Sequence, residues 1–317
     1  MTGTLITTQD NSAWLNREMS HKTSTLSILV PYYKDDPRAL ISALSADAPK
    51  GIELILFDDG MPDQALNKAV NRTLQALTFP ARLITARHNL GRAAGRNHLA
   101  HHARASWVLY LDSDMDIPTH FLASWLEWAG SEQADIYYGG FDMPTTIAPE
   151  HRLHAALARA GDVHDAASRD DGGAHTMASS NLLVRRSVLM NTPFDEGFSG
   201  WGWEDIDWTL RAGEYARLMH VDLSAHHKGL QTVETLLAKF EQGGKNFARF
   251  LARHPEAHKR PAAKLAKLLK PLPFKPLQKT LYAELAKTEI LPLRLRVMAL
   301  KVYRALCAAQ ALGKVKR

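Results

Sequence analysis

The chain has 317 residues, of which 45% are hydrophobic and 23% charged, and its formal net charge is +6, which describes an ordinary globular protein with a sizeable core. Its single cysteine, Cys307, excludes an internal disulfide and favours a reducing compartment, so we expect a cytoplasmic protein. No stretch reaches the roughly 18 apolar residues of a membrane-spanning helix, and we expect neither such a helix nor a secretion signal.

The first predicted elements form a β-α-β unit. Residues 1–24 are polar and lack periodicity, so we expect a flexible leader there. The apolar run TLSILVPYY predicts a buried strand that ends near Pro31. DDPRALISALSA then shows helical spacing of its apolar residues, and IELILFDDG predicts a second strand that ends at Asp58 and Asp59.

The alternation of strands and helices continues along the chain. A helix is expected near residues 63–77, followed by a strand ARLITAR, a helix within GRAAGRNHLAHHARA and a strand WVLYLDSD. This order predicts a mostly parallel, doubly wound sheet flanked by helices. Ligands bind beyond the carboxyl ends of such strands, so the polar residues found there are expected to converge on one edge.

The remaining chain is less regular. Between about residues 119 and 230 we expect strands in ADIYYGGFDM and RLMHVDLSAHHKG, a helix in RLHAALARA and a loop in SRDDGGAHTMASSN. Helices dominate beyond residue 231. We therefore expect four regions, with boundaries near residues 24, 118 and 230.

The last region is strongly basic. Residues 231–317 contain 19 Lys and Arg against 5 Asp and Glu, a net charge of +14, which leaves −8 for residues 1–230. RPAAKLAKLLK predicts a helix with a basic face and a leucine face, formed by Arg260, Lys264 and Lys267 and by Leu265, Leu268 and Leu269. Two interpretations stay open: residues 257–317 contact an anionic membrane surface, or the basic side chains are simply solvated.

Two aspartates follow the strand WVLYL. Asp112 and Asp114 lie two residues apart, so both carboxylates can face one small volume. Such oxygen ligands suit Mg²⁺ or Mn²⁺, and a metal held by one or two carboxylates leaves positions for substrate phosphates. The pair could instead cap a helix. A phosphatase-type site with Asp112 as nucleophile fits poorly, because Met115 stands where such sites usually have Thr or Val.

The segment NLGRAAGRN combines small and cationic residues. Gly91 and Gly95 permit close approach of the backbone, and Arg92 and Arg96 carry charges that can meet a diphosphate. No Gly-Lys-Ser/Thr follows, so the segment is not a P-loop, and the glycine spacing is not that of the dinucleotide fingerprint.

Five segments together resemble one family. SILVPYYKDDPRALISAL, ELILFDDG, NLGRAAGRN, LYLDSD and GWGWEDIDWTLR have the order and approximate spacing found in glycosyltransferase family 2, over about residues 25–228. The Trp-Gly-Trp-Glu-Asp segment looks most like that of chondroitin-type polymerases and β-1,4-galactosyltransferases. The resemblance implies an α/β GT-A fold with a mostly parallel Rossmann-like sheet, to which a helical basic C-terminal extension is added.

The resemblance also implies an activity. It indicates a metal-dependent inverting glycosyltransferase that moves a sugar from a nucleotide-diphosphate sugar, most simply a UDP-sugar, to a hydroxyl of a glycan or lipid-linked acceptor in cell-surface polysaccharide synthesis. Residues 25–118 would then form the nucleotide-sugar-binding half and residues 119–230 the acceptor-binding and catalytic half. No nucleic acid is expected as a partner, and any membrane contact would be peripheral, on the inner face.

The matched motifs assign roles on the donor side. The residues implied to contact the nucleotide sugar are Pro31, Tyr32, Asp58 or Asp59, Arg96 and Asp112. The implied ligands of Mn²⁺ or Mg²⁺ are Asp114, with Asp112 beside it, and a histidine after the catalytic acid. SAHHKG offers His226 and His227 for that ligand, and we favour His227.

The segment GWGWEDIDW supplies the acceptor side. Asp205 matches the general base of the inverting members, and Glu204 would hold donor or acceptor hydroxyls. Trp201 and Trp203 would form walls, because indole planes pack against the apolar faces of sugar rings. Asp207 would face away or brace the loop. The alternative is a hydrophobic corner whose acids begin a helix, where the dipole favours negative charge.

Two other classes of protein remain as alternatives. A sugar-1-phosphate nucleotidyltransferase also uses an α/β sheet with metal-binding carboxylates, but LVPYYKDDP lacks the early glycine-rich loop of that class. A catalytically silent carbohydrate-binding protein would be expected to lose the metal or base carboxylates, and all are present here.

Overall fold

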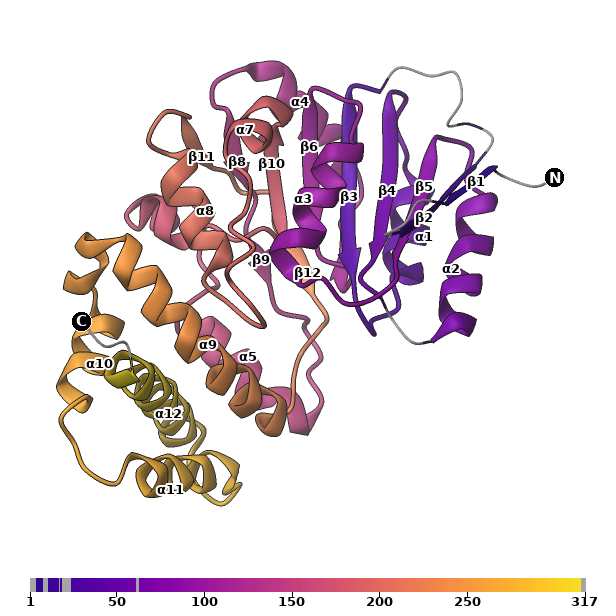
Figure 1. Cartoon of the computed structure of the whole chain (residues 1–317). Helices are drawn as coiled ribbons and strands as arrows, with labels where there is room; N and C mark the ends of the chain where they lie inside the picture. Colours follow the sequence, from indigo (N-terminus) through magenta and orange to yellow (C-terminus); the bar gives the residue numbers. More distant parts are fainter. Residues whose placement is uncertain (1–3, 8–10, 17, 19–23, 61–62, 315–317) are drawn as a thin grey trace. The chain divides into compact units, whose positions relative to one another are not determined.

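A computed structural model describes residues 4–7, 11–16, 18, 24–60 and 63–314 (Figure 1). The strands are β1 Thr4–Thr7, β2 Asn11–Leu15, β3 Leu26–Tyr32, β4 Ile52–Asp58, β5 Ala81–Ala86, β6 Trp107–Leu111, β7 Met115–Asp116, β8 Ile136–Tyr138, β9 Phe141–Asp142, β10 Asn181–Arg185, β11 Leu218–His220 and β12 Ala225–His227. The helices are α1 Arg38–Ala46, α2 Gln64–Gln75, α3 Arg92–His102, α4 Phe121–Ser131, α5 Arg152–Arg159, α6 Ala166–Asp170, α7 Arg186–Asn191, α8 Glu204–Ala212, α9 Val233–Arg253, α10 Pro261–Leu269, α11 Lys275–Lys287 and α12 Leu293–Lys314.

The chain divides into two compact units. The first, the sheet unit, comprises Met1–Met143, His164–Glu196 and Trp208–Gly229. The second, the helical unit, comprises Pro144–Val163, Gly197–Asp207 and Leu230–Arg317. The expected boundary near residue 118 falls inside the sheet unit, because strands from both sides of it pair in one sheet. The expected boundary near residue 230 lies where the last segment of the helical unit begins.

The sheet unit is built on one nine-stranded sheet in the order β1-β2-β5-β4-β3-β6-β10-β8-β11. Its centre is parallel, since β5, β4, β3 and β6 pair in parallel as the alternation of strands and helices requires. β10 pairs antiparallel with both β6 and β8. The expected α/β architecture, with a mostly parallel central sheet flanked by helices, is confirmed.

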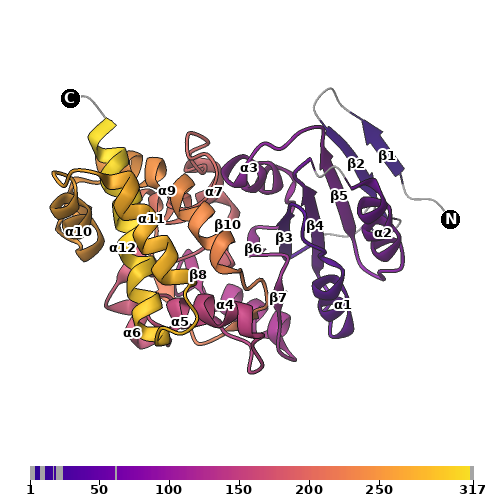
Figure 2. The ribbon, with the colours of Figure 1, turned by 90° about the horizontal axis from the view of Figure 1, so that it is seen from below.

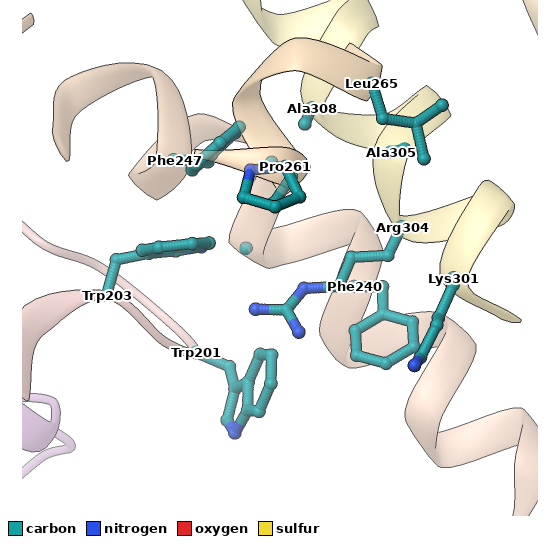
Figure 3. Close-up of a pocket in the computed structure, with 13 residues that line it drawn as sticks. Trp201, Trp203, Phe240, Phe247, Pro261, Leu265, Lys301, Arg304, Ala305 and Ala308 are labelled. Carbon is teal, nitrogen blue, oxygen red and sulfur yellow. The ribbon is translucent and has the colours of Figure 1, made fainter. Parts of the chain in front are cut away.

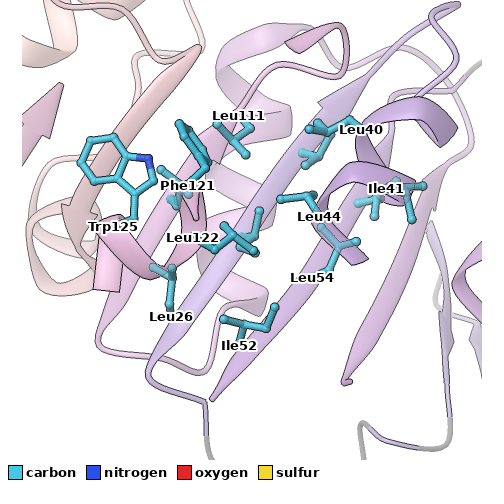
Figure 4. Packing of buried hydrophobic residues seen from close by; sticks show 14 of the residues in the cluster. Leu26, Leu40, Ile41, Leu44, Ile52, Leu54, Leu111, Phe121, Leu122 and Trp125 are labelled. Atoms are coloured by element: carbon cyan, nitrogen blue, oxygen red, sulfur yellow. The ribbon is translucent and has the colours of Figure 1, made fainter. Parts of the chain in front are cut away.

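Apolar side chains pack on both faces of this sheet. β3 is buried over almost its whole length, with Ile28 on one face and Leu29 on the other, which explains its continuous apolar sequence. One face packs against α1, α2 and α4 (Figure 4), and the members drawn there include Leu40, Leu44, Leu122 and Trp125. The opposite face packs against α3 and α7. Strand ends, rather than strand faces, are therefore left to form a site.

Two expectations are corrected within the sheet unit, and one strand is new. The leader expected over residues 1–24 contains strands β1 and β2, and β2 pairs antiparallel with β5, with Trp14 buried in the core. The other leader residues include 1–3, 8–10, 17 and 19–23, which lie outside the described residues. The loop expected in SRDDGGAHTMASSN includes the end of α6 and a 3₁₀ turn over Gly173–Thr176. Strand β10 was not anticipated.

A small second sheet carries the expected histidine. β12 pairs antiparallel with β7 and parallel with β9, in the order β7-β12-β9. In this register His227 lies opposite Met115 and His226 opposite Asp116. The second sheet thus brings the SAHHKG segment beside the turn that follows β6.

The helical unit has its own core (Figure 2). α12 packs against α9, α10 and α11, around side chains such as Leu236, Phe240 and Leu300. Gly244 of α9 permits a close approach to α12, because an added Cβ would lie 2.8 Å from the Cys307 carbonyl oxygen. No helix within the described part of the chain is long and apolar enough to span a membrane.

Helix α10 uses a different face from the one its sequence predicts. Its buried residues are Ala263 and Ala266, and Leu268 is 71% exposed. The small alanines permit close packing on α12, which turns a leucine of the expected apolar face outward. The sequence RPAAKLAKLLK therefore forms the predicted helix but does not bury the predicted leucine stripe.

Candidate functional site

The expected site residues are divided between the two units. Asp112, Asp114 and His227 belong to the sheet unit, as do the residues expected to bind the nucleotide. Trp201, Trp203 and the carboxylates up to Asp207 belong to the helical unit.

The sheet unit brings an aspartate and a histidine together after β6. His227 Nε2 lies 3.5 Å from Asp114 Oδ2, with the side chains 19% and 25% exposed. His226, its neighbour on β12, is exposed on the other side of the strand. Strand alternation therefore selects His227, the histidine favoured from the sequence, as the one beside Asp114.

The Asp114 carboxylate is strongly perturbed. Its Oδ1 atom is buried and has no hydrogen-bond partner among the described residues. Burial raises the pKa of Asp114, His227 opposes this rise, and the charges of Asp112 and Asp35 add to it. A buried carboxylate oxygen without a partner is costly, and a cation placed against it would remove that cost.

Gly229 leaves the space that Asp114 occupies. A Cβ atom added to Gly229 would lie 1.7 Å from Asp114 Oδ2, well inside van der Waals contact. The backbone of the adjacent Lys228 donates a hydrogen bond to the Asp114 carbonyl oxygen at 2.9 Å. The SAHHKG segment thus shapes the environment of Asp114 through both its histidine and its glycine.

These residues do not form a complete metal centre by themselves. Within the described ranges, no group of three or more His, Cys, Asp or Glu side chains has the geometry of a metal site. Asp112 Oδ1 instead lies 3.3 Å from Arg96. Asp114 and His227 offer one oxygen and one nitrogen ligand, which suits an ion that takes its remaining ligands from water or phosphate oxygens.

Arg96 lies beneath Asp112. Its side chain is 1% exposed, its Nη2 contacts Asp112, and its guanidinium lies 5.8 Å from the ring of Phe194. In this structure its charge therefore acts on the Asp112 carboxylate, which it orients. The expected contact of Arg96 with the nucleotide stays a prediction.

The two aspartates at the end of β4 make contacts within the protein. Asp59 accepts hydrogen bonds from the backbone N–H groups of Leu90 and Gly91 at 2.6 and 3.0 Å, so it holds the loop that begins α3. Burial raises the pKa of Asp59, and these hydrogen bonds oppose the rise. Asp58 is fully buried and accepts from Asn67 Nδ2 at 2.6 Å. Which of the two contacts a base remains a prediction.

The end of β3 exposes a residue that sequence reasoning missed. Tyr32, expected beside the nucleoside, is 3% exposed and packs in the core, and burial raises the pKa of its hydroxyl. Pro31 is partly buried and Tyr33 is 38% exposed. Alternation along the strand explains this difference, so Pro31 and Tyr33 are the better placed of the three for a ligand.

Arg169, in the segment expected to be a loop, contacts two segments that were expected to be strands. It is 1% exposed and donates hydrogen bonds to the carbonyl oxygens of His164, Gly139 and Val221, with Val221 at 2.8 Å. Gly140 leaves room for it, because an added Cβ would collide with the guanidinium. A buried arginine that binds carbonyl groups carries no sequence signature, and the only signal here was its place in a glycine-rich segment.

In the helical unit, the segment GWGW forms a tight loop held by one amide. Gly200, Gly202 and Trp203 all have positive φ angles, which glycine adopts freely and tryptophan does not. Asn246 of α9 is 3% exposed, and its Nδ2 lies 3.0, 3.3 and 2.9 Å from the carbonyl oxygens of Ser199, Trp201 and Gly202. The loop is therefore tied to α9.

The two tryptophans of this loop line a cavity of about 410 Å³ (Figure 3). Trp203 packs on Phe247 and Phe250 with ring centroids 4.5 and 4.9 Å away, and Trp201 lies 5.8 Å from Phe240. Each indole thus has one face supported by the protein and can present another to the cavity. This geometry is what a wall for a sugar ring requires.

The three carboxylates after the loop have unequal surroundings. Glu204 is 2% exposed, and Asp205 is partly exposed at the first turn of α8. Asp207 is completely buried, and its Oδ1 lies 3.0 Å from both Arg253 Nη1 and His254 Nε2. Asp207 therefore pairs with Arg253 and His254 at the end of α9. Of the three, Asp205 is the most accessible.

Solved structures share this fold. The mannosyltransferase PcManGT from Pyrobaculum calidifontis, in complex with GDP-Man and Mn²⁺, aligns with a TM-score of 0.56 at 17% identity, over 93% of this chain and 89% of that chain. S. aureus TarS aligns with a TM-score of 0.54 at 17% identity, over 89% of this chain and 54% of that chain. TarS 1–349 in complex with UDP gives 0.51 at 16% identity, over 92% and 93%. The fold is that of the GT-A glycosyltransferases.

The sequence pattern described as Glycosyl transferase family 2 matches residues 27–192, more than half of the chain. This protein belongs to glycosyl transferase family 2. An uncharacterized glycosyltransferase of Haemophilus influenzae is 32% identical over 91 residues, which is 28% of this chain and 29% of that protein. The match thus spans less than a third of that relative, and the chain covers about half of the full TarS chain. The chondroitin-type likeness of residues 200–208 lies outside the matched region and remains a prediction.

Proposed function

We propose that this protein is a metal-dependent inverting glycosyltransferase that moves a sugar from a nucleotide-diphosphate sugar, a UDP-sugar in the simplest case, to a hydroxyl of a glycan or lipid-linked acceptor. Family membership and the GT-A fold support the reaction class. The observation that carries the metal dependence is the buried, unpartnered Oδ1 of Asp114 beside His227. Similar structures determined with UDP and with GDP-Man and Mn²⁺ support a nucleotide-sugar donor.

On the donor side, Asp114 and His227 would hold Mn²⁺ or Mg²⁺, with Asp112 oriented nearby by Arg96. Such an ion would offset the negative charge that grows on the leaving diphosphate. The buried orphan oxygen fits either ion, and the histidine nitrogen favours Mn²⁺ over Mg²⁺. Pro31 and Asp59 are proposed to border the nucleoside, together with the exposed Tyr33.

On the acceptor side, Asp205 is the proposed general base. It would take the proton of the acceptor hydroxyl as that oxygen attacks the anomeric carbon and the bond to the nucleotide diphosphate breaks. Glu204 would accept hydrogen bonds from sugar hydroxyls, and Trp201 and Trp203 would pack against the ring. Direct displacement by one nucleophile inverts the anomeric configuration, so an α-linked donor gives a β-linked product.

The first test is a panel of UDP-, GDP- and dTDP-sugars, each assayed with Mn²⁺ and with excess chelator, scored by nucleotide release. We expect one donor to be used in the presence of Mn²⁺ and release to stop on chelation, because the leaving diphosphate then has no counter-charge. Activity that persists after complete chelation would contradict the assignment of Asp114 and His227.

A second prediction concerns Gly229. In Gly229→Ala the new methyl group displaces the Asp114 carboxylate, so we expect Mn²⁺ affinity, measured by titration calorimetry, to fall by about 10- to 100-fold, the usual range for residues that orient a ligand. Gly130→Ala is the matched control, because its Cβ meets no atom within 4 Å. Equal affinities in the two variants would remove Asp114 from the metal site.

A membrane contact through residues 257–317 is proposed as the partner interaction of the helical unit. α10, α11 and the segments after each expose apolar side chains, which include Leu268, Phe274, Leu277, Leu281 and Ile290. Exposed lysines on α10 would add attraction to anionic lipid. We expect co-sedimentation with phosphatidylserine vesicles at low salt and none with phosphatidylcholine vesicles, and a failure to sediment with the anionic vesicles would exclude the contact. Residues 315–317 lie outside the described part of this region.

A further inference from the structure

The cavity of the helical unit has an unusual charge pattern. It lies between the 200–203 loop and helices α9, α10 and α12, and its volume of about 410 Å³ is within the range of small-molecule sites (Figure 3). Its lining includes two cationic side chains, Lys301 and Arg304, and none of its lining residues is acidic. The rest of the lining is apolar or aromatic. The cavity is therefore a positively charged pocket with aromatic walls.

Arg304 is held by rings rather than by carboxylates. Its guanidinium carbon lies 5.9 Å from the centre of the Trp201 ring, 5.4 Å from Trp203 and 5.5 Å from Phe240. Among the described residues it makes no hydrogen bond and no ion pair. Its side chain is exposed, so the part of the guanidinium that the rings do not cover faces the cavity and water.

An arginine in this setting has unused binding capacity. A guanidinium carries five N–H donors and stays protonated in proteins, so contact with rings leaves these donors open to water or to a ligand. Stacking on aromatic rings fixes the plane of the group, which prepares it to bind a carboxylate or phosphate through two parallel hydrogen bonds. Lys301 adds a second positive charge on the same wall, and its Nζ has only a 3.4 Å contact to the Ala160 carbonyl oxygen.

We propose that this cavity binds the anionic group of an acidic glycan, with Arg304 and Lys301 on the carboxylate or phosphate and Trp201 and Trp203 against the sugar ring. The inference deepens the proposed function, on which it rests, because it makes the acceptor a charged sugar. The combination of charge and aromatic planes carries the argument. Cations alone would bind any small anion, and rings alone would bind neutral sugars, whereas this lining offers both within one sugar-sized space.

The test uses three small probes and no donor nucleotide. Binding of methyl β-D-glucuronide, glucose 6-phosphate and methyl β-D-glucoside to the full chain is measured by saturation-transfer NMR titration. We expect at least one of the two charged sugars to bind about tenfold more tightly than the neutral glucoside, the gain of one charge-assisted interaction. Which of the two charged probes binds better distinguishes a carboxylate from a phosphate.

Variants assign the effect to the cavity. Arg304→Gln should abolish the preference for the charged sugar and leave the weak binding of the glucoside unchanged, and Arg304→Lys should keep part of the preference. Arg294→Gln is the control, since Arg294 is an exposed arginine on the same helix that does not line the cavity. A circular dichroism spectrum like that of the unaltered chain is required of each variant.

Three outcomes would overturn the proposal. The first is equal binding of charged and neutral sugars by the unaltered chain, and the second is a preference that survives Arg304→Gln. The third is binding of decyl phosphate without binding of either charged sugar, which would make the occupant a lipid phosphate. Because no donor is present, these binding measurements do not depend on whether the protein transfers a sugar. If no nucleotide sugar is used as a donor but the charged sugar is still preferred, the proposed function is contradicted and the binding proposal is not.

Discussion

Replacement of Asp205 by asparagine is expected to reduce sugar transfer by about 10²- to 10⁴-fold, the usual contribution of a general base. Asparagine has nearly the same shape and remains at the first turn of α8, so the protein should fold as before. It cannot take a proton from the acceptor hydroxyl, and this is why the rate falls. The measurement is nucleotide release with saturating donor and acceptor, together with the dissociation constant of the nucleotide, which should not change.

Glu214→Gln provides the matched control for this experiment. Glu214 is exposed just beyond the end of the same helix, and its substitution removes the same charge at a distance from the loop. We expect it to retain full activity. Near-normal turnover in Asp205→Asn would remove Asp205 from the mechanism. An α-linked product from an α-linked donor, identified by NMR, would contradict the single-base mechanism altogether.

The second large effect is expected at Asp207, whose replacement should lower the stability of the fold. Asp207→Ala leaves Arg253 and His254 without the carboxylate that lies 3.0 Å from each. Arg253 is 37% exposed, so water compensates part of its charge, and the loss of hydrogen bonds to the buried carboxylate is expected to cost about 1–3 kcal/mol. We expect a fall in the urea midpoint of unfolding, measured by tryptophan fluorescence.

A surface ion pair serves as the comparison. Asp36 and Arg38 lie 2.6 Å apart, but their side chains are 42% and 47% exposed, so water already compensates both charges. Asp36→Ala should leave the urea midpoint almost unchanged. If Asp207→Ala unfolds at the same urea concentration as the unaltered chain, the Asp207 cluster does not stabilise the helical unit. Asp205→Asn and Asp207→Ala thus distinguish an aspartate that is proposed to react from one that stabilises the structure.

The parallel centre of the sheet could be predicted from sequence because its strands are buried on both faces. β3 and β4 are continuous apolar runs that differ clearly from the amphipathic helices between them. The sequences of β2 and β10 are not long apolar runs, so they do not stand out from their neighbours in this way. NSAWL begins with polar residues on a flank of the sheet, and NLLVR is a short run at the end of a segment expected to be a loop. Their pairing depends on partners far away in the chain, which periodicity does not reveal.

In the candidate site, too, contacts between distant parts of the chain could not be predicted from the sequence. The motif order located Asp114 and His227, and alternation along β12 then decided between the two histidines. Sequence spacing did not reveal that Arg96 turns inward to Asp112, or that Asp207 meets side chains 46 and 47 residues later. Burial of charges depends on three-dimensional packing, so motifs predict which residues gather and not which of them remain accessible.

The contacts of Asn246 determine where the chain can be truncated without loss of the GWGW loop. The family pattern ends at residue 192, and a chain shortened after Gly229 would still contain every described strand. Such a fragment would lack the amide that gathers three carbonyl groups of the GWGW loop, as well as the rings on which both tryptophans rest. The contacts from α9 therefore fix the conformation of the loop. A minimal functional fragment has to include this helix.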